Sequence, residues 1–140
     1  MRALIDTCIV IDTLQDRAPF SEHTKQIFFA AANNTFLGYV SAKSLTDVYY
    51  IMHRYTHDDK TSRDVLNKLV ALFNVLDTAG IDCRKAIPSP TTDYEDAMMI
   101  ETALREEMDC IVTRNTDDFI KSPIPVYTPE QFLQKLNEEE

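Results

Sequence analysis

The sequence predicts an α/β fold with three layers, in which helices cover both faces of a central, mostly parallel sheet of four to five strands. Short apolar runs of strand length alternate with segments whose apolar residues recur at helical spacing. Sequential strand–helix–strand units of this kind form parallel sheets. The chain has 140 residues, 44% apolar and 26% charged, which suits a single domain over residues 1–140 with a substantial core.

The first strand ends at Asp6 and turns directly into a short helix of residues 7–14. Ser21 has the residue type of a helix N-cap, so a second helix is expected after it. Residues 35–40 form the next apolar run and are predicted to be the second strand. The inner face of the second helix is expected to carry Ile27, Phe28 and Ala31.

Ser41 is expected to cap a third helix that ends near Arg54, and a fourth helix is expected over residues 61–73. Tyr50 and Ile51 make the third helix apolar almost all round, which predicts packing on both of its sides. The expected core positions of these two helices are Leu45, Val48, Tyr49 and Met52, then Val65, Leu66, Leu69, Val70 and Phe73.

Residues 74–77 suit a short strand, and residues 79–87 suit one or two helical turns. After a proline-rich break, Asp93 is expected to cap a fifth helix that runs to about Met108. The inward positions of that helix are Ala97, Ile100, Ala103 and Leu104.

A further strand is expected at residues 110–113, and an edge strand at residues 125–127, where proline is tolerated. Thr128 then combines with a first-turn proline and with Gln131 in the pattern of a capping box. The last helix is therefore expected to begin there.

Composition excludes several classes of function. Only two glycines, Gly38 and Gly80, are present, so the chain has no glycine-rich phosphate-binding loop. A net charge of −9 is unusual for a protein that holds nucleic acid by bulk electrostatics. It fits better with a cluster of carboxylates that holds cations, or with a basic partner.

The three cysteines are far apart and no Cys/His pair has the spacing of a zinc site. They are expected to be free thiols in a reducing cytoplasm. Met1 runs directly into the first strand, and no apolar run has the length of a membrane span. A cytoplasmic protein that does not enter a membrane is expected.

Several acidic and polar residues follow the predicted strands. Asp6 ends the first strand, Asp47 lies early in the helix after the second, and Asn115 and Asp118 follow residues 110–113. Asp96 lies in the first turn of the fifth helix and on its inward stripe. Because the carboxyl ends of parallel strands share one edge of a sheet, these residues are expected to converge there.

Each acid also has a purely structural explanation. Asp6 could simply cap the helix that follows, and Asp96 could form an acidic capping box with Asp93. Asp47 alone would be an ordinary solvated helix residue, and Asp118 a turn acid. Together, however, converged carboxylates repel one another, and a hard divalent cation with oxygen ligands relieves that repulsion.

Four segments together resemble the PIN domain, the metal-dependent ribonuclease fold of many bacterial toxin–antitoxin toxins. The similarity runs nearly end to end, and the first and last segments are specific in combination. The segments are Leu4-Ile5-Asp6-Thr7, Ser41-Ala42-Lys43-Ser44-Leu45-Thr46-Asp47, Asp93-Tyr94-Glu95-Asp96-Ala97 and Val112-Thr113-Arg114-Asn115-Thr116-Asp117-Asp118-Phe119.

The resemblance implies an endoribonuclease in which Mg²⁺ or Mn²⁺ polarises the scissile phosphate and activates a water, leaving a 5′-phosphate and a 3′-hydroxyl. It implies metal binding by Asp6, Asp96 and Asp118, with Asp47 and Asn115 completing the catalytic set. Asp47 stands where the family usually has glutamate, Asn115 where many members have aspartate, and Cys8 where asparagine is frequent.

Basic residues near the proposed edge are candidate phosphate contacts, although each is also explained as a plain surface charge. The resemblance further implies an RNA substrate, an antitoxin partner and homodimers, and the acidic charge balance would suit a basic antitoxin segment across the site. The candidate phosphate contacts are Lys43, Arg54, Arg114 and Lys121.

A different class of function stays open, namely a PIN-like module that binds RNA or protein without cutting. Cys8, Asp47 and Asn115 motivate this alternative. Two other acid-bearing folds are disfavoured. A haloacid-dehalogenase-type phosphatase needs Asp-x-Asp after its first strand, and this chain has Cys8 in place of the second aspartate. A receiver domain needs an acid pair at the end of its first strand and a lysine late in the chain. Here Asp6 stands alone at that turn, and Thr113 is followed by Arg114 and not by a lysine after a further strand.

Overall fold

The structure of the protein is a computed structural model that describes residues 1–139. A five-stranded, entirely parallel sheet with the order β3-β2-β1-β4-β5 forms its centre. In register, Leu4 of β1 lies opposite Tyr39 of β2 and Ile111 of β4. The strands are β1 (Arg2–Ile5), β2 (Leu37–Ser41), β3 (Asn74–Leu76), β4 (Cys110–Val112) and β5 (Val126–Tyr127).

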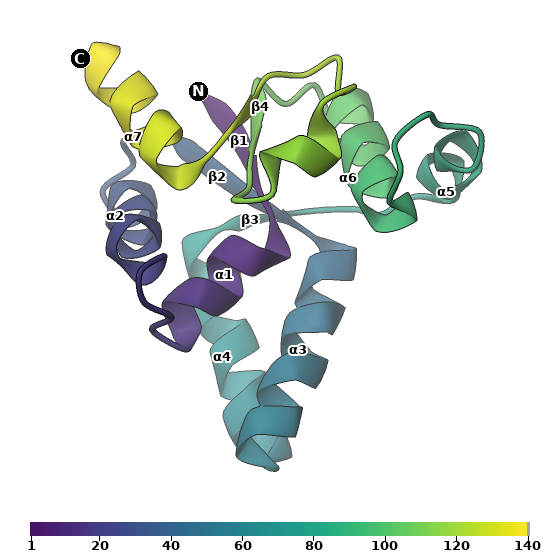
Figure 1. The fold of residues 1–140 in the computed structure, drawn as a ribbon. Helices are drawn as coiled ribbons and strands as arrows, with labels where there is room; N and C mark the ends of the chain where they lie inside the picture. The colour runs from purple at the N-terminus through teal and green to yellow at the C-terminus, as the bar shows by residue number, and fades with distance from the viewer. Residues whose placement is uncertain (140) are drawn as a thin grey trace.

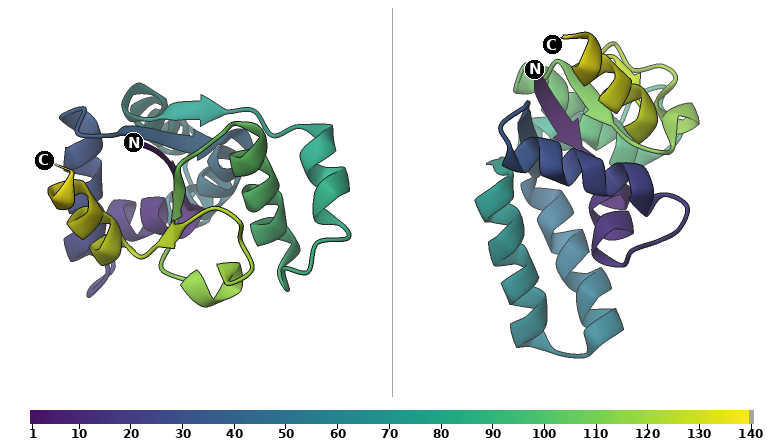
Figure 2. Two further views of the ribbon diagram at one scale, coloured as in Figure 1. Left: turned by 90° about the horizontal axis from the view of Figure 1, so that it is seen from above. Right: turned by 90° about the vertical axis from the view of Figure 1, so that its left-hand side faces the viewer.

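Helices lie on both faces of this sheet, as the sequence predicted (Figure 1). Seen from above, α2 and α7 flank one side of the sheet and α5 and α6 the other (Figure 2). The helices are α1 (Thr7–Leu14), α2 (Ser21–Ala32), α3 (Ala42–Thr56), α4 (Asp59–Leu72), α5 (Gly80–Ala86), α6 (Tyr94–Arg105) and α7 (Pro129–Glu138), with a 3₁₀ turn η1 (Thr116–Phe119).

Alternating strand side chains build a core on each face of the sheet. Ala3 and Ile5 point to one face, where they pack with residues of α1, α2, α3, α4 and α7. Leu4 and Ile111 point to the other face, where they pack with α6 and the segment after β4. Because β1 and β4, at the centre of the sheet, are buried on both faces, their sequences are continuous apolar runs.

Most predicted helix caps are confirmed. The Ser41 and Asp93 side chains accept hydrogen bonds from the third backbone N–H of their helices, and Thr128 and Gln131 form the expected capping box. Ser21 is a correction: it is the first residue of α2 and is buried, and Phe20 precedes it without a side-chain cap. Burial between helices therefore explains Ser21 better than capping.

Three apolar positions that were expected inside face solvent instead. Tyr50 is 62% exposed, Val70 47% and Leu104 41%. Each lies on the outer margin of a helical stripe, where no neighbouring element among residues 1–139 covers it. The fifth predicted helix also ends at Arg105, before Met108, because Glu107 adopts a positive φ of 56° and breaks the helical path.

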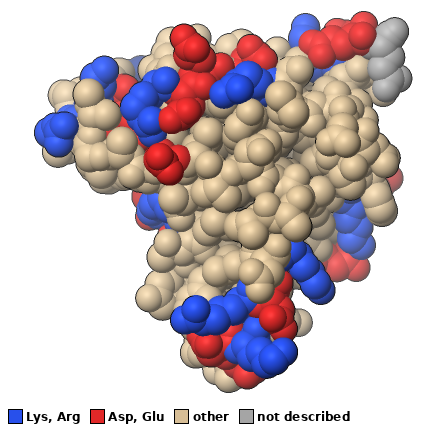
Figure 3. Space-filling model, turned by 180° about the vertical axis from the view of Figure 1, so that it is seen from behind, with Lys and Arg blue, Asp and Glu red and all other residues tan. Residues whose placement is uncertain are grey.

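The helices α3 and α4 form a hairpin that projects beneath the sheet (Figure 2, right). From behind, positive and negative side chains alternate at the tip of this hairpin, and the middle of that face carries almost no charge (Figure 3). The tip pairs include Arg63–Asp59 and Lys60–Asp64. That face therefore offers no continuous basic surface.

Within residues 1–139, no helix has both the length and the apolarity needed to cross a membrane.

Candidate functional site: an acidic cleft at the carboxyl edge of the sheet

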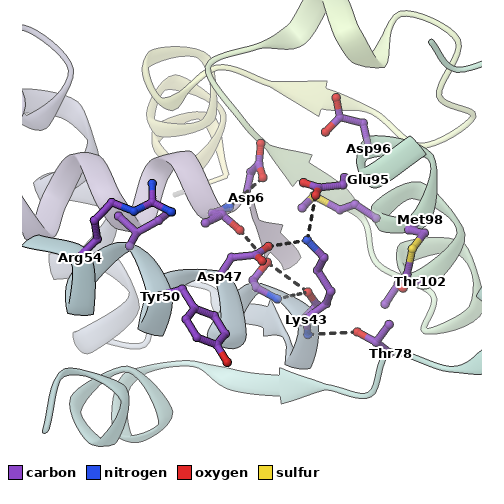
Figure 4. Close-up of a pocket in the computed structure, with 15 residues that line it drawn as sticks. Asp6, Lys43, Asp47, Tyr50, Arg54, Thr78, Glu95, Asp96, Met98 and Thr102 are labelled. Atoms are coloured by element: carbon purple, nitrogen blue, oxygen red, sulfur yellow. Dashed lines mark hydrogen bonds and ion pairs between the residues drawn. The ribbon is translucent and has the colours of Figure 1, made fainter. Parts of the chain in front are cut away.

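The parallel strands deliver three polar side chains to one edge of the sheet. β1 leads into Asp6, β2 ends in Ser41 and β4 leads into Thr113. A cleft of about 310 Å³ opens at this edge between α3 and α6 (Figure 4). Its lining includes Asp6, Thr7, Ser41, Lys43, Ser44, Asp47, Tyr50, Arg54, Thr78, Glu95 and Asp96.

Asp6 is held firmly in place. Its Oδ1 accepts the Thr7 N–H at 2.7 Å as the N-cap of α1, and its Oδ2 accepts the Thr113 hydroxyl at 2.7 Å. The Cys8 thiol adds a longer contact of 3.5 Å. Burial raises the pKa of Asp6, and the hydrogen bonds from Thr113, Cys8 and Thr7 only partly offset this. Asp6 therefore both caps the helix and faces the cleft.

Asp96 is the least satisfied acid of the cleft. Its carboxylate accepts no hydrogen bond from any of residues 1–139, whereas its backbone N–H donates to Asp93 Oδ1 at 3.1 Å. The reciprocal half of an acidic capping box is thus not formed. Burial, and then the charges of Asp6, Asp93, Asp118 and Glu95, raise the pKa of Asp96 to about 7. A cation at this point would relieve an electrostatic cost that the fold leaves in place.

Asp47 and Glu95 are paired with the same lysine. Lys43 Nζ lies 2.6 Å from Asp47 Oδ2, one turn along α3, and 3.2 Å from Glu95 Oε1 on α6 (Figure 4). Partial burial would lower the pKa of Lys43, but the hydrogen bonds to Asp47 and Glu95 outweigh it and raise the pKa. The lysine thereby joins the two walls of the cleft.

The segment after β4 contributes less directly. Asp118 is exposed on η1, yet close enough for its charge to raise the pKa of Asp96. Asn115 is exposed, and its backbone N–H donates to the Thr113 hydroxyl oxygen at 3.1 Å. Neither side chain is among the residues that line the cleft.

The four candidate phosphate contacts have different surroundings. Lys43 and Arg54 line the cleft, but Lys43 is paired, whereas Arg54 has no ion-pair partner within residues 1–139. Arg114 turns away: its Nε donates to the fully buried Asp12 at 2.7 Å, and its guanidinium lies over the Phe20 ring. Lys121 is exposed after η1 and does not line the cleft.

Sequence reasoning overlooked three residues of this site. Thr113 positions Asp6, Glu95 binds Lys43, and Tyr50 is an exposed aromatic ring on the cleft wall. Tyr50 could have been suspected, since it stands one turn before Arg54 on the same helix. Thr113 and Glu95 carry no such signal, because their partners come from distant parts of the chain.

The donor set of the cleft suits a hard divalent cation. Within the described part of the chain, no three acidic, histidine or cysteine side chains are already arranged as a metal site. Every acid in the cleft nevertheless offers oxygen, Asp96 is unpaired, and Asp6 keeps lone pairs beyond its hydrogen bonds. Mg²⁺ and Mn²⁺ bind through a few carboxylates plus water, so Asp6 and Asp96 fit such an ion.

Comparisons with known structures agree with this architecture. A DNA-bound VapBC from Salmonella typhimurium has a TM-score of 0.69 at 19% identity, over 92% of this chain and 98% of that one. A toxin–antitoxin complex from Klebsiella pneumoniae has a TM-score of 0.67 at 23% identity, over 91% and 97%. VapC20 of Mycobacterium tuberculosis, a toxin that cleaves the sarcin–ricin loop, has a TM-score of 0.66 at 10% identity, over 85% and 94%.

At these identities the likeness to solved structures establishes the fold. A search of curated proteins found no match. A family model described as PIN domain matches residues 2–117, which include β1 to β4 and every acid of the cleft. With that match over most of its length, the chain belongs to the PIN domain family.

Proposed function

We propose that this protein is an endoribonuclease that depends on Mg²⁺ or Mn²⁺, and that it is the toxin of a toxin–antitoxin pair. The observation that carries the proposal is the unpaired Asp96 beside the buried Asp6, in a cleft at the carboxyl edge of the sheet. Carboxylates that share a cleft and whose pKa values are raised by burial or by neighbouring charges, as those of Asp6 and Asp96 are, are typical of functional sites. The PIN family supports nuclease chemistry, and the structural neighbour from Mycobacterium tuberculosis cleaves the sarcin–ricin loop.

The acids of the cleft and the residues that hydrogen-bond to them have separate roles in the proposed cleavage of RNA. Asp6 and Asp96 would hold the divalent ion, and Asp118, whose charge acts on Asp96, is the candidate third ligand. When bound, such an ion supplies positive charge against the scissile phosphate and acidifies a water. Thr113 keeps the Asp6 carboxylate oriented, and the N-cap bond to Thr7 fixes its other oxygen.

RNA would enter along α3. Arg54 offers an unpaired guanidinium to a phosphate, and Tyr50, 62% exposed, offers a ring on which a base can stack. A net charge of −9 leaves this local attraction as the main contribution to RNA binding. The same acidic cleft suits a basic antitoxin segment, and toxin–antitoxin complexes among the structural neighbours support such a partner. Homodimerisation and a cytoplasmic location stay predictions.

A binding module that does not cut is the second candidate. The pairing of Asp47 with Lys43 favours it, because it occupies an acid that would otherwise be free for metal. Under this alternative the cleft would hold RNA or a protein segment, and loss of Asp96 would leave that binding intact.

Metal-dependent cleavage of RNA tests both candidates. Metal-stripped protein is incubated with a panel of labelled RNAs, with and without Mn²⁺ or Mg²⁺, beside Asp6→Asn and Asp96→Asn prepared identically. We expect cleavage only with metal, and a loss on the order of 1,000-fold in both variants, since metal-ion stabilisation is worth several kcal/mol.

Asp64→Asn, on the exposed side of α4, serves as the matched acid control and should cut normally. Equal cleavage by all preparations would indicate a contaminating nuclease and contradict the proposal. RNA binding without cleavage, unchanged in Asp96→Asn, would support the binding module.

A further inference from the structure

Lys43 bridges the two walls of the cleft with one ammonium group. Its Nζ lies 2.6 Å from Asp47 Oδ2 on α3 and 3.2 Å from Glu95 Oε1 on α6. The backbone at this residue is anchored as well, because the Lys43 N–H donates to the Thr78 hydroxyl at 3.2 Å. The Lys43 side chain is 35% exposed. It extends across the cleft between Asp47 and Glu95 (Figure 4).

Four carboxylates line this cleft, namely those of Asp6, Asp47, Glu95 and Asp96. They divide into two pairs. Asp47 and Glu95 share the Lys43 ammonium, whereas Asp6 has only neutral donors and Asp96 has none among residues 1–139. The Asp47 and Glu95 carboxylates are therefore already neutralised in part by the Lys43 ammonium, whereas Asp6 and Asp96 have no cation between them among residues 1–139.

A lysine ammonium between two carboxylates does part of the electrostatic work of a divalent ion. It neutralises charge and fixes the distance between the carboxylates, although it cannot acidify a water. Two-metal sites place their ions close together within one acidic cleft, each ion bridging carboxylates. In this cleft the Nζ of Lys43 bridges one pair of carboxylates, those of Asp47 and Glu95, where a second ion would otherwise lie.

We propose that Lys43 stands in for a second divalent ion, so that the cleft binds one such ion per chain, at Asp6 and Asp96. Asp47 is then a positioning residue that holds Lys43, and not a metal ligand. This inference rests on the proposed metal-dependent function. It also accounts for the shorter aspartate at position 47, whose carboxylate meets Lys43 one helical turn away.

Counting bound Mn²⁺ tests this directly, without measuring activity. Metal-stripped protein is titrated by calorimetry, and free Mn²⁺ is followed by its electron paramagnetic resonance signal. We expect one Mn²⁺ per chain in the wild type and two in Lys43→Met, because Asp47 and Glu95 then need another cation. The double variant Lys43→Met/Asp47→Asn should return to one.

Lys60→Met is the matched control, because Lys60 forms the same one-turn pair with Asp64 at 3.3 Å, away from the cleft. Lys60→Met should bind one Mn²⁺ ion, and so should Lys43→Arg, which keeps the positive charge. If Lys43→Met folds poorly, Lys43→Gln replaces it and should bind two ions.

Two ions in the wild type, or one ion in both neutral Lys43 variants, would overturn the role of Lys43 and leave the proposed nuclease intact. An absence of Mn²⁺ binding in every variant would overturn the proposed metal site together with this inference.

Discussion

Asp82 is buried and Asp96 is half-buried; they lie on neighbouring helices, and the fold treats them in opposite ways. Asp82, in the first turn of α5, accepts hydrogen bonds from Arg105 Nε at 2.9 Å, from the Thr102 hydroxyl at 2.9 Å and from the Ala79 N–H at 3.0 Å. Burial alone would raise the pKa of Asp82, but these donors hold it below its usual value. Asp96, on α6, has no comparable donor among residues 1–139, and its pKa rises to about 7.

The difference separates acids that stabilise the fold from acids left for a ligand. Asp82 joins α5 to α6, and the fully buried Asp12 joins α1 to the segment after β4 through Arg114 in the same way. An unpaired carboxylate contributes nothing comparable and costs stability when it ionises. Its presence at the edge of a parallel sheet is therefore informative about function.

The largest expected effect comes from exchanging these acids for amides. Asp82→Asn should lower the free energy of unfolding by about 2 to 3 kcal/mol, because Arg105 loses its charged partner. Asp96→Asn should leave it unchanged or raise it by about 1 kcal/mol in metal-free buffer, because a repelled charge is removed. Urea unfolding of both variants and the wild type measures the two values.

If Asp96→Asn proves as destabilising as Asp82→Asn, Asp96 has a structural partner and the distinction between the two acids collapses. Asp64→Asn provides the baseline for an exposed acid on α4.

The pH dependence of stability should follow the lowered pKa of Asp82. The unfolded carboxyl titrates near pH 3.9, and the folded one below that. The stability that Asp82 contributes is therefore fully present above about pH 4 and is lost as pH falls through the folded pKa. The gap between wild type and Asp82→Asn in urea unfolding should close over this acid range. A gap that does not narrow as the pH falls below about 4 would mean that the effect is one of packing and not of charge.

The parallel sheet explains why much of the site could be predicted from the sequence. Asp6 and Asp96 were expected to converge because strand order and helix stripes fix where those backbone positions lie. The direction of long side chains could not be predicted in the same way. Arg114 lies at the correct edge of the sheet, yet its guanidinium turns to Asp12, whose burial depends on how α1 packs. Lys43 was expected to meet phosphate, and its pairing with Glu95 depends on the separation of α3 and α6.

Asp6 is intermediate between the two acids, because its donors are neutral, and the Thr113 hydroxyl and the Thr7 N–H both donate to it at 2.7 Å. Thr113→Val removes the 2.7 Å hydrogen bond while keeping the side-chain shape in the buried strand end. We expect Mn²⁺ affinity to fall about 10-fold, as is typical when a residue that orients a ligand is lost. Calorimetry with Thr116→Val, on η1, as the control would show whether the loss is specific. Unchanged affinity would mean that Thr7 and Cys8 orient Asp6 without Thr113.

The smallest expected effect concerns two arginines, which differ, as Asp82 and Asp96 do, in whether they have a charged partner. Arg54 has no ion-pair partner among residues 1–139, whereas Arg63 on the neighbouring helix is paired with Asp59 at 2.9 Å. An arginine that neutralises a phosphate releases cations condensed on the RNA, and an arginine already paired with a carboxylate is less available for this. Arg54→Met should therefore reduce the salt slope of RNA binding by about 0.7. Arg63→Met should leave the slope unchanged. Fluorescence anisotropy with a single-stranded RNA and the non-cutting Asp96→Asn background measures both slopes. Equal slopes for the two variants would mean that RNA does not pass along α3, and would move the phosphate path to the other wall of the cleft.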